Sequence, residues 1–153
     1  MLKLDETDMK LLRLLQRDAG VSTADAARRI GVRQALVARR LERMTARGVI
    51  RGWTVDVDAR ALGYAVSVSL RVTLDKTNNR AFDEFIRAAK DVPEVDAIET
   101  FLGRVDVRLN VLARDLDHYQ EIYRTRILPL PHILDLEALM LIADIKDSAE
   151  LPI

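Results

Sequence analysis

Arginine side chains are concentrated in one short stretch of the chain, where they could contact a polyanion. Residues 28–51 contain eight arginines, no lysine and a single acid, Glu42. A guanidinium carries a planar fork of donors that can contact phosphates or bridge the O6 and N7 atoms of guanine. The cluster therefore indicates a nucleic-acid partner, although a solvated helix face is the alternative reading of any charge run.

The two halves of the chain carry opposite charge, although the formal net charge of all 153 residues is zero. Residues 1–60 contain 13 Lys and Arg against 8 Asp and Glu, whereas residues 61–153 contain 11 against 16. Such an asymmetry favours a polyanion as the partner of the basic half.

The arginines lie in the last of three segments with helical periodicity. Leucine spacing predicts a first helix over about residues 6–18, capped by Asp5 or Thr7. Further helices are predicted over residues 24–30 and 33–47, joined by a tight glycine-containing turn. This arrangement matches a helix-turn-helix, and a generic three-helix bundle is the structural alternative.

The third predicted helix has an aliphatic face and a guanidinium face. Val37, Leu41 and Met44 lie within about 60° of one another at 100° per residue, and arginines occupy the opposite arc. Because the major groove of B-DNA admits one helix, we expect this helix to enter it. The predicted DNA-binding residues are Arg33, Gln34, Ala35, Arg39, Arg40, Arg43 and Arg47.

A connector is expected to follow the third helix. Residues 49–57 mostly alternate between apolar and polar types and predict a short strand that acts as a wing or connector. Trp53 is expected to pack between this segment and the helices, and stacking on a base is the less favoured role. We place a DNA-binding domain at residues 1–62 and a second domain at residues 63–153.

The second domain reads as strand, helix, strand, strand, helix, strand. The predicted strands cover about residues 65–74, 95–102, 105–111 and 133–145, and the helices lie within 78–92 and about 115–127. This order is the ferredoxin-like arrangement, an α+β fold with one antiparallel sheet and both helices on one face.

Two details of this domain are specific enough to check. The first helix should turn Phe82, Phe85, Ile86 and Ala89 toward the core, with Asn78 or Asn79 as its cap. Residues 138–143 are apolar on both sides of the last strand. An exposed apolar patch marks an interaction surface, so we expect at least a homodimer.

Both halves together resemble the Lrp/AsnC (leucine-responsive/asparagine regulator) family of transcription factors. In the first half the resemblance rests on LDETDMKLLRLLQRDAGVS, AARRIGV, VARRLERM and GVIRGW. In the second half it rests on LGY, PEV, the G-x-x-D of residues 103–106, LPLPHIL and the closing IK. These motifs occur in the family's order over nearly the whole chain.

The resemblance implies dimers, often assembled into larger rings around which DNA wraps, and an amino-acid or related effector held between second domains. The effector residues implied at matching positions are Leu102, Gly103, Arg104, Asp106, Ala138 and Met140. Asp106 would pair with an effector ammonium or, as an equal alternative, bond its own hairpin turn.

Several positions depart from the family pattern. Arg33 stands where a capping Ser or Thr is common, and such a lost cap costs about 1 kcal/mol. Leu102 and Ala138 replace threonines, which removes polar anchors for an effector. His132 replaces a glycine before the last strand, and we expect this change to be benign.

Other classes of protein receive little support from the sequence. The chain has no cysteine and only two histidines, without a metal-binding or nucleophile pattern, so we expect no metal site, cofactor or catalytic residue. A decarboxylase of modified tetrapyrroles, similar in fold, is one alternative, and an architectural DNA-packaging protein is the other. We expect a cytoplasmic protein without a signal peptide or membrane partner.

Overall fold

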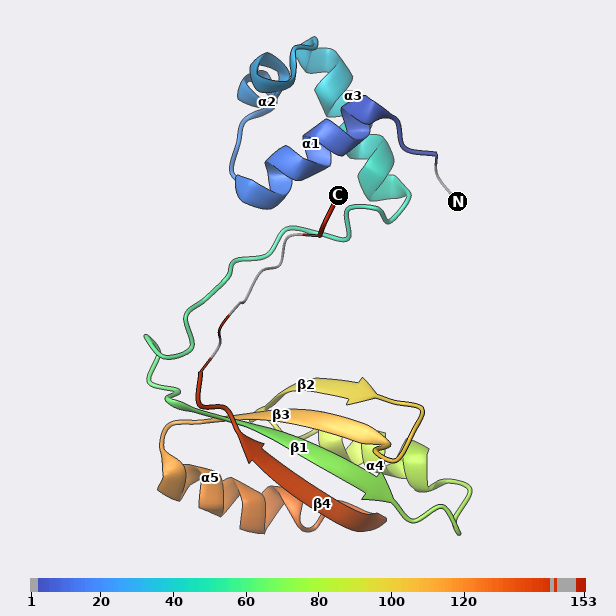
Figure 1. The fold of residues 1–153 in the computed structure, drawn as a ribbon, viewed down its shortest axis with the longest axis vertical. Helices are drawn as coiled ribbons and strands as arrows, with labels where there is room; N and C mark the ends of the chain where they lie inside the picture. Colours follow the sequence, from blue (N-terminus) through green and yellow to red (C-terminus); the bar gives the residue numbers. More distant parts are fainter. Residues whose placement is uncertain (1–2, 144, 146–150) are drawn as a thin grey trace. The chain divides into compact units, whose positions relative to one another are not determined.

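A computed structural model of the chain describes residues 3–143, 145 and 151–153 (Figure 1). These residues form two units: residues 3–56 with 151–153 make up the first, and residues 57–143 with 145 make up the second. The boundary expected between residues 62 and 63 stays a prediction.

Three helices make up the first unit: α1 (Glu6–Arg17), α2 (Thr23–Ile30) and α3 (Gln34–Ala46) (Figure 1). All three confirm the prediction from periodicity. Asp5 caps α1 through a capping box in which Asp5 and Asp8 each accept a hydrogen bond from the other's backbone N–H. Ser22 caps α2, and Gly31 ends it in the left-handed conformation at φ 74°.

Aliphatic side chains from the three helices form the core of this unit. Val37 and Met44 of α3 and Leu11 of α1 are completely buried, with Leu41 half-buried beside them. Burial of one such side chain contributes about 1.5–3 kcal/mol. The predicted aliphatic face of α3 is confirmed, and the arginines of α3 lie on the other side of the helix.

Residues 49–57 do not form the expected strand. They have no regular structure, and Val55 is 82% exposed. Alternation produces a strand only where a second strand supplies hydrogen-bond partners, and no described strand pairs with this segment. The expected packing of Trp53 is also wrong, because its side chain is 57% exposed and lies outside the core of the unit.

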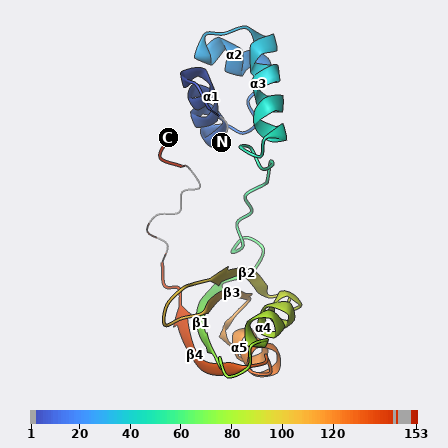
Figure 2. The ribbon, with the colours of Figure 1, turned by 90° about the vertical axis from the view of Figure 1, so that its right-hand side faces the viewer.

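The second unit confirms the ferredoxin-like order. Its elements are β1 (Val66–Leu74), α4 (Ala81–Lys90), β2 (Val95–Thr100), β3 (Val107–Ala113), α5 (Leu116–Ile122), the π-helical turn η1 (Tyr123–Ile127) and β4 (Ile133–Met140). The strands pair antiparallel in the order β2-β3-β1-β4. Figure 2 shows α4 and α5 on the same side of the sheet.

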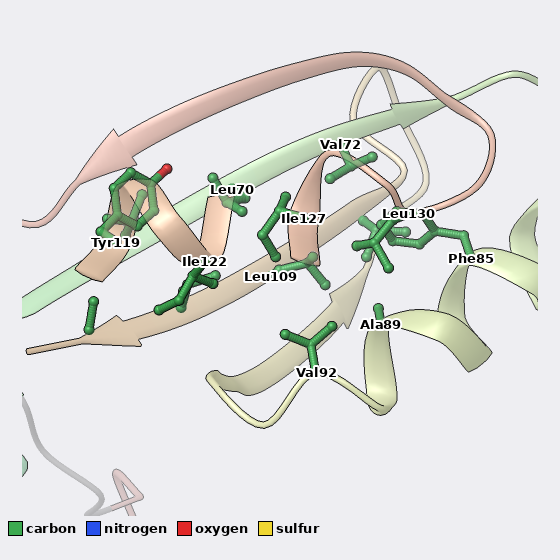
Figure 3. Packing of buried hydrophobic residues seen from close by; sticks show 14 of the residues in the cluster. Leu70, Val72, Phe85, Ala89, Val92, Leu109, Tyr119, Ile122, Ile127 and Leu130 are labelled. Atoms are coloured by element: carbon green, nitrogen blue, oxygen red, sulfur yellow. The ribbon is translucent and has the colours of Figure 1, made fainter. Parts of the chain in front are cut away.

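The core of the second unit lies between the sheet and these helices (Figure 3). Leu70 and Val72 of β1 pair with Leu109 and Val107 of β3, and all four are completely buried. Phe85 of α4 reaches the same layer. The strict alternation in residues 66–74 therefore predicted the buried face of β1 correctly.

The face and the cap of α4 differ from expectation. Phe82 is 44% exposed, and Ala81 takes its place in the buried row with Phe85 and Ala89. This row recurs every four residues, which leaves Phe82 about 100° away from Ala81 on the helix. The Asn78 side chain accepts a hydrogen bond from the Arg80 N–H in a turn before the helix, so neither asparagine is the cap.

The last strand is shorter than predicted. β4 ends at Met140, which pairs with Val68 of β1, and the Leu141 N–H still bonds the Ser67 carbonyl. Residues 144 and 146–150, which include part of the predicted strand and the closing IK lysine, lie outside the described residues.

Candidate nucleic-acid interface and effector region

Three arginines project from α3 and its two caps without a partner among the residues that the structure describes. Arg33, Arg39 and Arg47 are exposed and form no ion pair with any described residue. Arg33 is the N-cap of α3 but makes no side-chain capping bond, as its replacement of Ser or Thr predicts. These guanidiniums are therefore available to an anionic partner.

The other predicted residues at the start of α3 differ in their environment. Gln34 donates a hydrogen bond from Nε2 to Thr23 Oγ1 of α2 at 3.1 Å. Ala35 is exposed and places no polar group on the surface. The bond between Gln34 and Thr23 connects the beginnings of the two helices across the turn.

Arg40 and Arg43 are held by two carboxylates at the start of α1. Arg40 Nη1 lies 2.7 Å from both Asp5 oxygens and 2.7 Å from Asp8 Oδ1. Arg43 Nη2 donates to Asp8 Oδ2 at 2.6 Å. We call these four residues the ion cluster. It divides the predicted guanidinium stripe into three unpaired and two paired arginines.

Helical spacing explains how the ion cluster forms. Asp5 and Asp8 are three residues apart at the start of α1, and Arg40 and Arg43 are three apart on α3, so each pair shares one side of its helix. The Asp8 side chain is completely buried and that of Arg40 is 16% exposed. Sequence reasoning assigned Asp5 only to capping and gave Asp8 no role, because their partners lie more than 30 residues away.

The ion cluster lowers the pKa of both carboxyls. For Asp5 the hydrogen bond from Arg40 is the largest cause. Burial raises the pKa of Asp8, but the hydrogen bonds from Arg40 and from the Asp5 N–H outweigh it. Asp5, then Asp8, raises the pKa of Arg40. Near neutral pH the cluster thus holds two cations and two anions, with no net charge.

In the second unit, the β2–β3 turn carries most of the predicted effector residues. Leu102, Gly103 and Arg104 are exposed, whereas Asp106 is buried. Asp106 Oδ2 accepts a hydrogen bond from the Leu74 N–H at 2.9 Å, and its Oδ1 lies 2.8 Å from Lys76 Nζ. The Asp106 carboxylate therefore bonds the end of β1 rather than its own hairpin turn, and an effector ammonium would have to displace Lys76.

The pKa of Asp106 is lowered despite its burial. Burial raises this pKa, while the bonds from Lys76 and the Leu74 N–H lower it by more. The carboxylate is consequently charged near neutral pH and already neutralised by Lys76.

Ala138 and Met140 do not join this turn within one chain. They pair with Leu70 and Val68 of β1, whereas the Asp106 N–H bonds the Val72 carbonyl. Along β1 these positions are two and four residues away, or about 7 and 13 Å. The turn and the β4 residues therefore form two separate groups.

A cavity of about 600 Å³ occupies another part of the second unit. Tyr64, Arg114 and His118 contribute to its lining, and none of the predicted effector residues does. The lining comes from several separated segments, so no local motif marks it in the sequence.

Two family sequence models together match nearly the whole chain. One, described as winged helix-turn-helix DNA-binding, matches residues 4–51, and the other, the Lrp/AsnC ligand binding domain, matches residues 67–151. The second match alone covers more than half of the 153 residues. The chain belongs to the Lrp/AsnC family. The resemblance found in the sequence motifs is thereby confirmed.

Named relatives of this Lrp/AsnC protein are transcriptional regulators. It is 27% identical over 150 residues to the transcriptional regulator AzlB of Bacillus subtilis, covering 98% of this chain and 96% of that protein. It is 26% identical over 145 residues to the leucine-responsive regulatory protein of Haemophilus influenzae, covering 95% and 87%. The Lrp/AsnC protein is accordingly a DNA-binding transcriptional regulator.

Solved structures share its fold. An AsnC family regulator from Agrobacterium tumefaciens matches with a TM-score of 0.88 at 28% identity over 97% of each chain. A transcriptional regulator from Neisseria meningitidis, crystallised with L-Met, matches with a TM-score of 0.91 at 21% identity over 98% of this chain and 97% of that one. The second likeness concerns the fold alone.

The described residues of this Lrp/AsnC protein contain no group of three or more His, Asp or Glu side chains that could hold a metal ion. Nor do they include a helix that is long and apolar enough to cross a membrane.

Proposed function

We propose that this Lrp/AsnC protein recognises a specific site in double-stranded DNA by placing α3 in the major groove. Arg33, Arg39 and Arg47, which are exposed and unpaired within the described part of the chain, carry the proposal, because such guanidiniums bind phosphates and guanine edges. Gln34 and Ala35 lie at the start of α3, where recognition helices contact bases. Arg40 and Arg43 complete the proposed surface from within the ion cluster.

Footprinting on the DNA upstream of genes near its own tests this proposal. We expect protection centred on an operator, lost in Arg39→Ala and kept in the control Arg87→Ala, which removes an exposed arginine from α4. Uniform coverage of unrelated DNA would instead favour the packaging alternative.

A homodimer is part of the proposal, because two recognition helices can read a twofold-related site. The face of the sheet opposite α4 and α5 offers the surface: its Arg71 lies 3.5 Å from Glu137, and Leu139 pairs with Ser69 beside them. Exposed apolar side chains continue from it at Leu141 and Ile142. Sedimentation should show dimers or larger assemblies that Leu139→Glu weakens, whereas a monomeric wild type contradicts this part.

An amino acid or a related small molecule is the proposed effector. Two observations support it: the ligand-binding family model, and the fold shared with a regulator crystallised with L-Met. The β2–β3 turn (Leu102, Gly103, Arg104 and Asp106) and the β4 residues Ala138 and Met140 lie apart in one chain, so one site using both must take them from two copies. Leu102 and Ala138 offer no hydroxyl, which favours apolar contacts with the effector.

Thermal shift with a panel of L-amino acids, beginning with L-Met, tests the effector site, since a ligand of the native state raises stability. We expect Asp106→Ala to abolish the response while DNA affinity is kept. An equal shift in wild type and variant would exclude this location. A parallel variant of the cavity wall, His118→Ala, shows whether the effector binds there instead.

The proposal places this regulator in the cytoplasm, with its DNA, and gives it no catalytic residue. Both histidines serve local structure: His118 Nδ1 accepts a hydrogen bond from the Arg114 N–H at 3.2 Å, and His132 Nε2 lies 2.7 Å from Glu84 Oε2. His132 adopts a left-handed φ of 64°, a conformation that the glycine expected there from the family resemblance would adopt without strain.

A further inference from the structure

The two arginines of the ion cluster lie on α3, the same helix that carries the exposed arginines proposed to contact DNA. α3 and its two caps carry five guanidiniums, and the carboxylates of Asp5 and Asp8 neutralise two of them. Glu42 is the only acid on α3 itself. Most of the negative charge that balances α3 is therefore supplied from α1.

We propose that Asp5 and Asp8 are specificity-determining residues, which keep Arg40 and Arg43 from acting as free phosphate ligands. The inference rests on the proposed DNA binding by α3. Contacts with phosphates supply nearly all of sequence-independent DNA affinity, through release of counterions. A guanidinium already paired with a carboxylate releases fewer counterions, so the cluster lowers affinity for arbitrary DNA without removing groups that read bases.

The geometry favours a stable pairing over one that a phosphate displaces. Asp8 is completely buried and bonds both guanidiniums at once, at 2.7 and 2.6 Å. Pulling either arginine away would leave a buried carboxylate short of a partner, which is costly. Arg40 is the more restrained of the two, because it also contacts both oxygens of Asp5.

Helix capping does not explain the charge at position 5. Asn and Ser cap helices about as well as Asp does, since only an oxygen acceptor is required. The Asp5 carboxylate is 55% exposed, so burial does not select for it either. Besides the favourable position of an anion at a helix N-terminus, the ion pair with Arg40 is the contact among the described residues that uses the negative charge.

Asp5→Asn and Asp5→Ser separate the charge from the cap, because both keep an acceptor for the Asp8 N–H. The matched control is Asp18→Asn, which also removes one negative charge from the first unit. In the wild type, Asp18 Oδ2 lies 3.0 Å from Arg29 Nη1 of α2, so this charge is not paired with α3. The full-length proteins are titrated with a short mixed-sequence duplex over a series of salt concentrations. Circular dichroism confirms that each variant keeps its helices, and the two Asp5 variants serve as replicates of one change.

We expect both Asp5 variants to bind mixed-sequence DNA with a steeper salt dependence. The gain is at most one phosphate, a slope change of about 0.9 per recognition helix, or up to about eightfold in affinity at about 0.1 M salt. Affinity for the footprinted operator should rise less, so selectivity falls. If the salt-dependence slopes of the Asp5 variants equal that of Asp18→Asn, or are shallower than that of the wild type, the inference is overturned. The proposal that α3 binds DNA would then still stand. A wild type that binds neither duplex would overturn both.

Discussion

Asp8 and Asp106 are the two buried carboxylates among the described residues, one in each unit, and their partners differ. Asp8 bonds the guanidiniums of Arg40 and Arg43, which both come from the helix proposed to read DNA. Asp106 bonds one backbone N–H and the ammonium of Lys76, whose side chain is 66% exposed.

Asp8 therefore has partners that are held in place, whereas the cation paired with Asp106 can be exchanged for another. Two guanidiniums with planar donor forks restrain the position of α3 against α1, whereas a lysine on a flexible stem leaves its partner at little cost. The first unit therefore uses its buried carboxylate to hold a binding helix in place. The second unit presents a carboxylate whose cation a ligand could replace.

Asp8→Asn should have the largest effect, because it sets an amide against two guanidiniums in a buried site. Breaking a buried ion pair costs about 3–5 kcal/mol. We expect faster hydrogen exchange throughout α1 and α3 and unchanged exchange in β1 and β3. If the amides of α1 and α3 in Asp8→Asn exchange as slowly as they do in the control Asp18→Asn, Asp8 does not hold the two helices together.

Acid should weaken the ion cluster next. Since the folded pKa values of Asp5 and Asp8 lie below the ordinary 3.8, their contribution to stability is complete above that pH. It is lost as the pH falls from 3.8 through the folded values. We expect the urea midpoint of the first unit to drop over this range, and to drop less in Asp5→Asn. Identical acid dependence in the two proteins would contradict the pairing.

Lys76→Ala should change stability less than Asp8→Asn does, because Lys76 is 66% exposed and the Leu74 N–H still donates to Asp106 once Lys76 is removed. It should also free Asp106 for an effector ammonium. We therefore expect a larger thermal shift with the effector identified in the panel than wild type shows. A smaller shift would mean that Lys76 itself contributes to the effector site.

Periodicity predicted most of the fold, because buried faces repeat at fixed spacing in helices and strands. It failed at residues 49–57, where alternation is present but no described strand supplies hydrogen bonds. It also misplaced Phe82, since neighbouring apolar residues at 81 and 82 compete for one buried row and local sequence does not choose between them.

The candidate sites were harder to predict than the fold. Spacing alone placed Arg39 and Arg40 on the same guanidinium stripe, but only tertiary structure pairs Arg40 with Asp5 and Asp8, 35 and 32 residues away. Similarly, the two roles considered for Asp106 did not include its bonds to Lys76 and the Leu74 N–H, which lie about 30 residues away in the sequence. Long-range charge pairing leaves no periodic signal in a sequence.

The salt dependence of operator binding tests the central claim most directly. Arg33→Ala, Arg39→Ala and Arg47→Ala are compared with wild type and with Arg87→Ala on a duplex containing the footprinted site. If unpaired arginines of α3 contact phosphates, each of the three variants reduces the slope of log K against log salt by about 0.9 per recognition helix. An arginine that reads a guanine instead lowers affinity for the operator more than for mixed-sequence DNA. Wild-type slopes and affinities in all three variants would contradict the assignment of α3 as the DNA-binding helix.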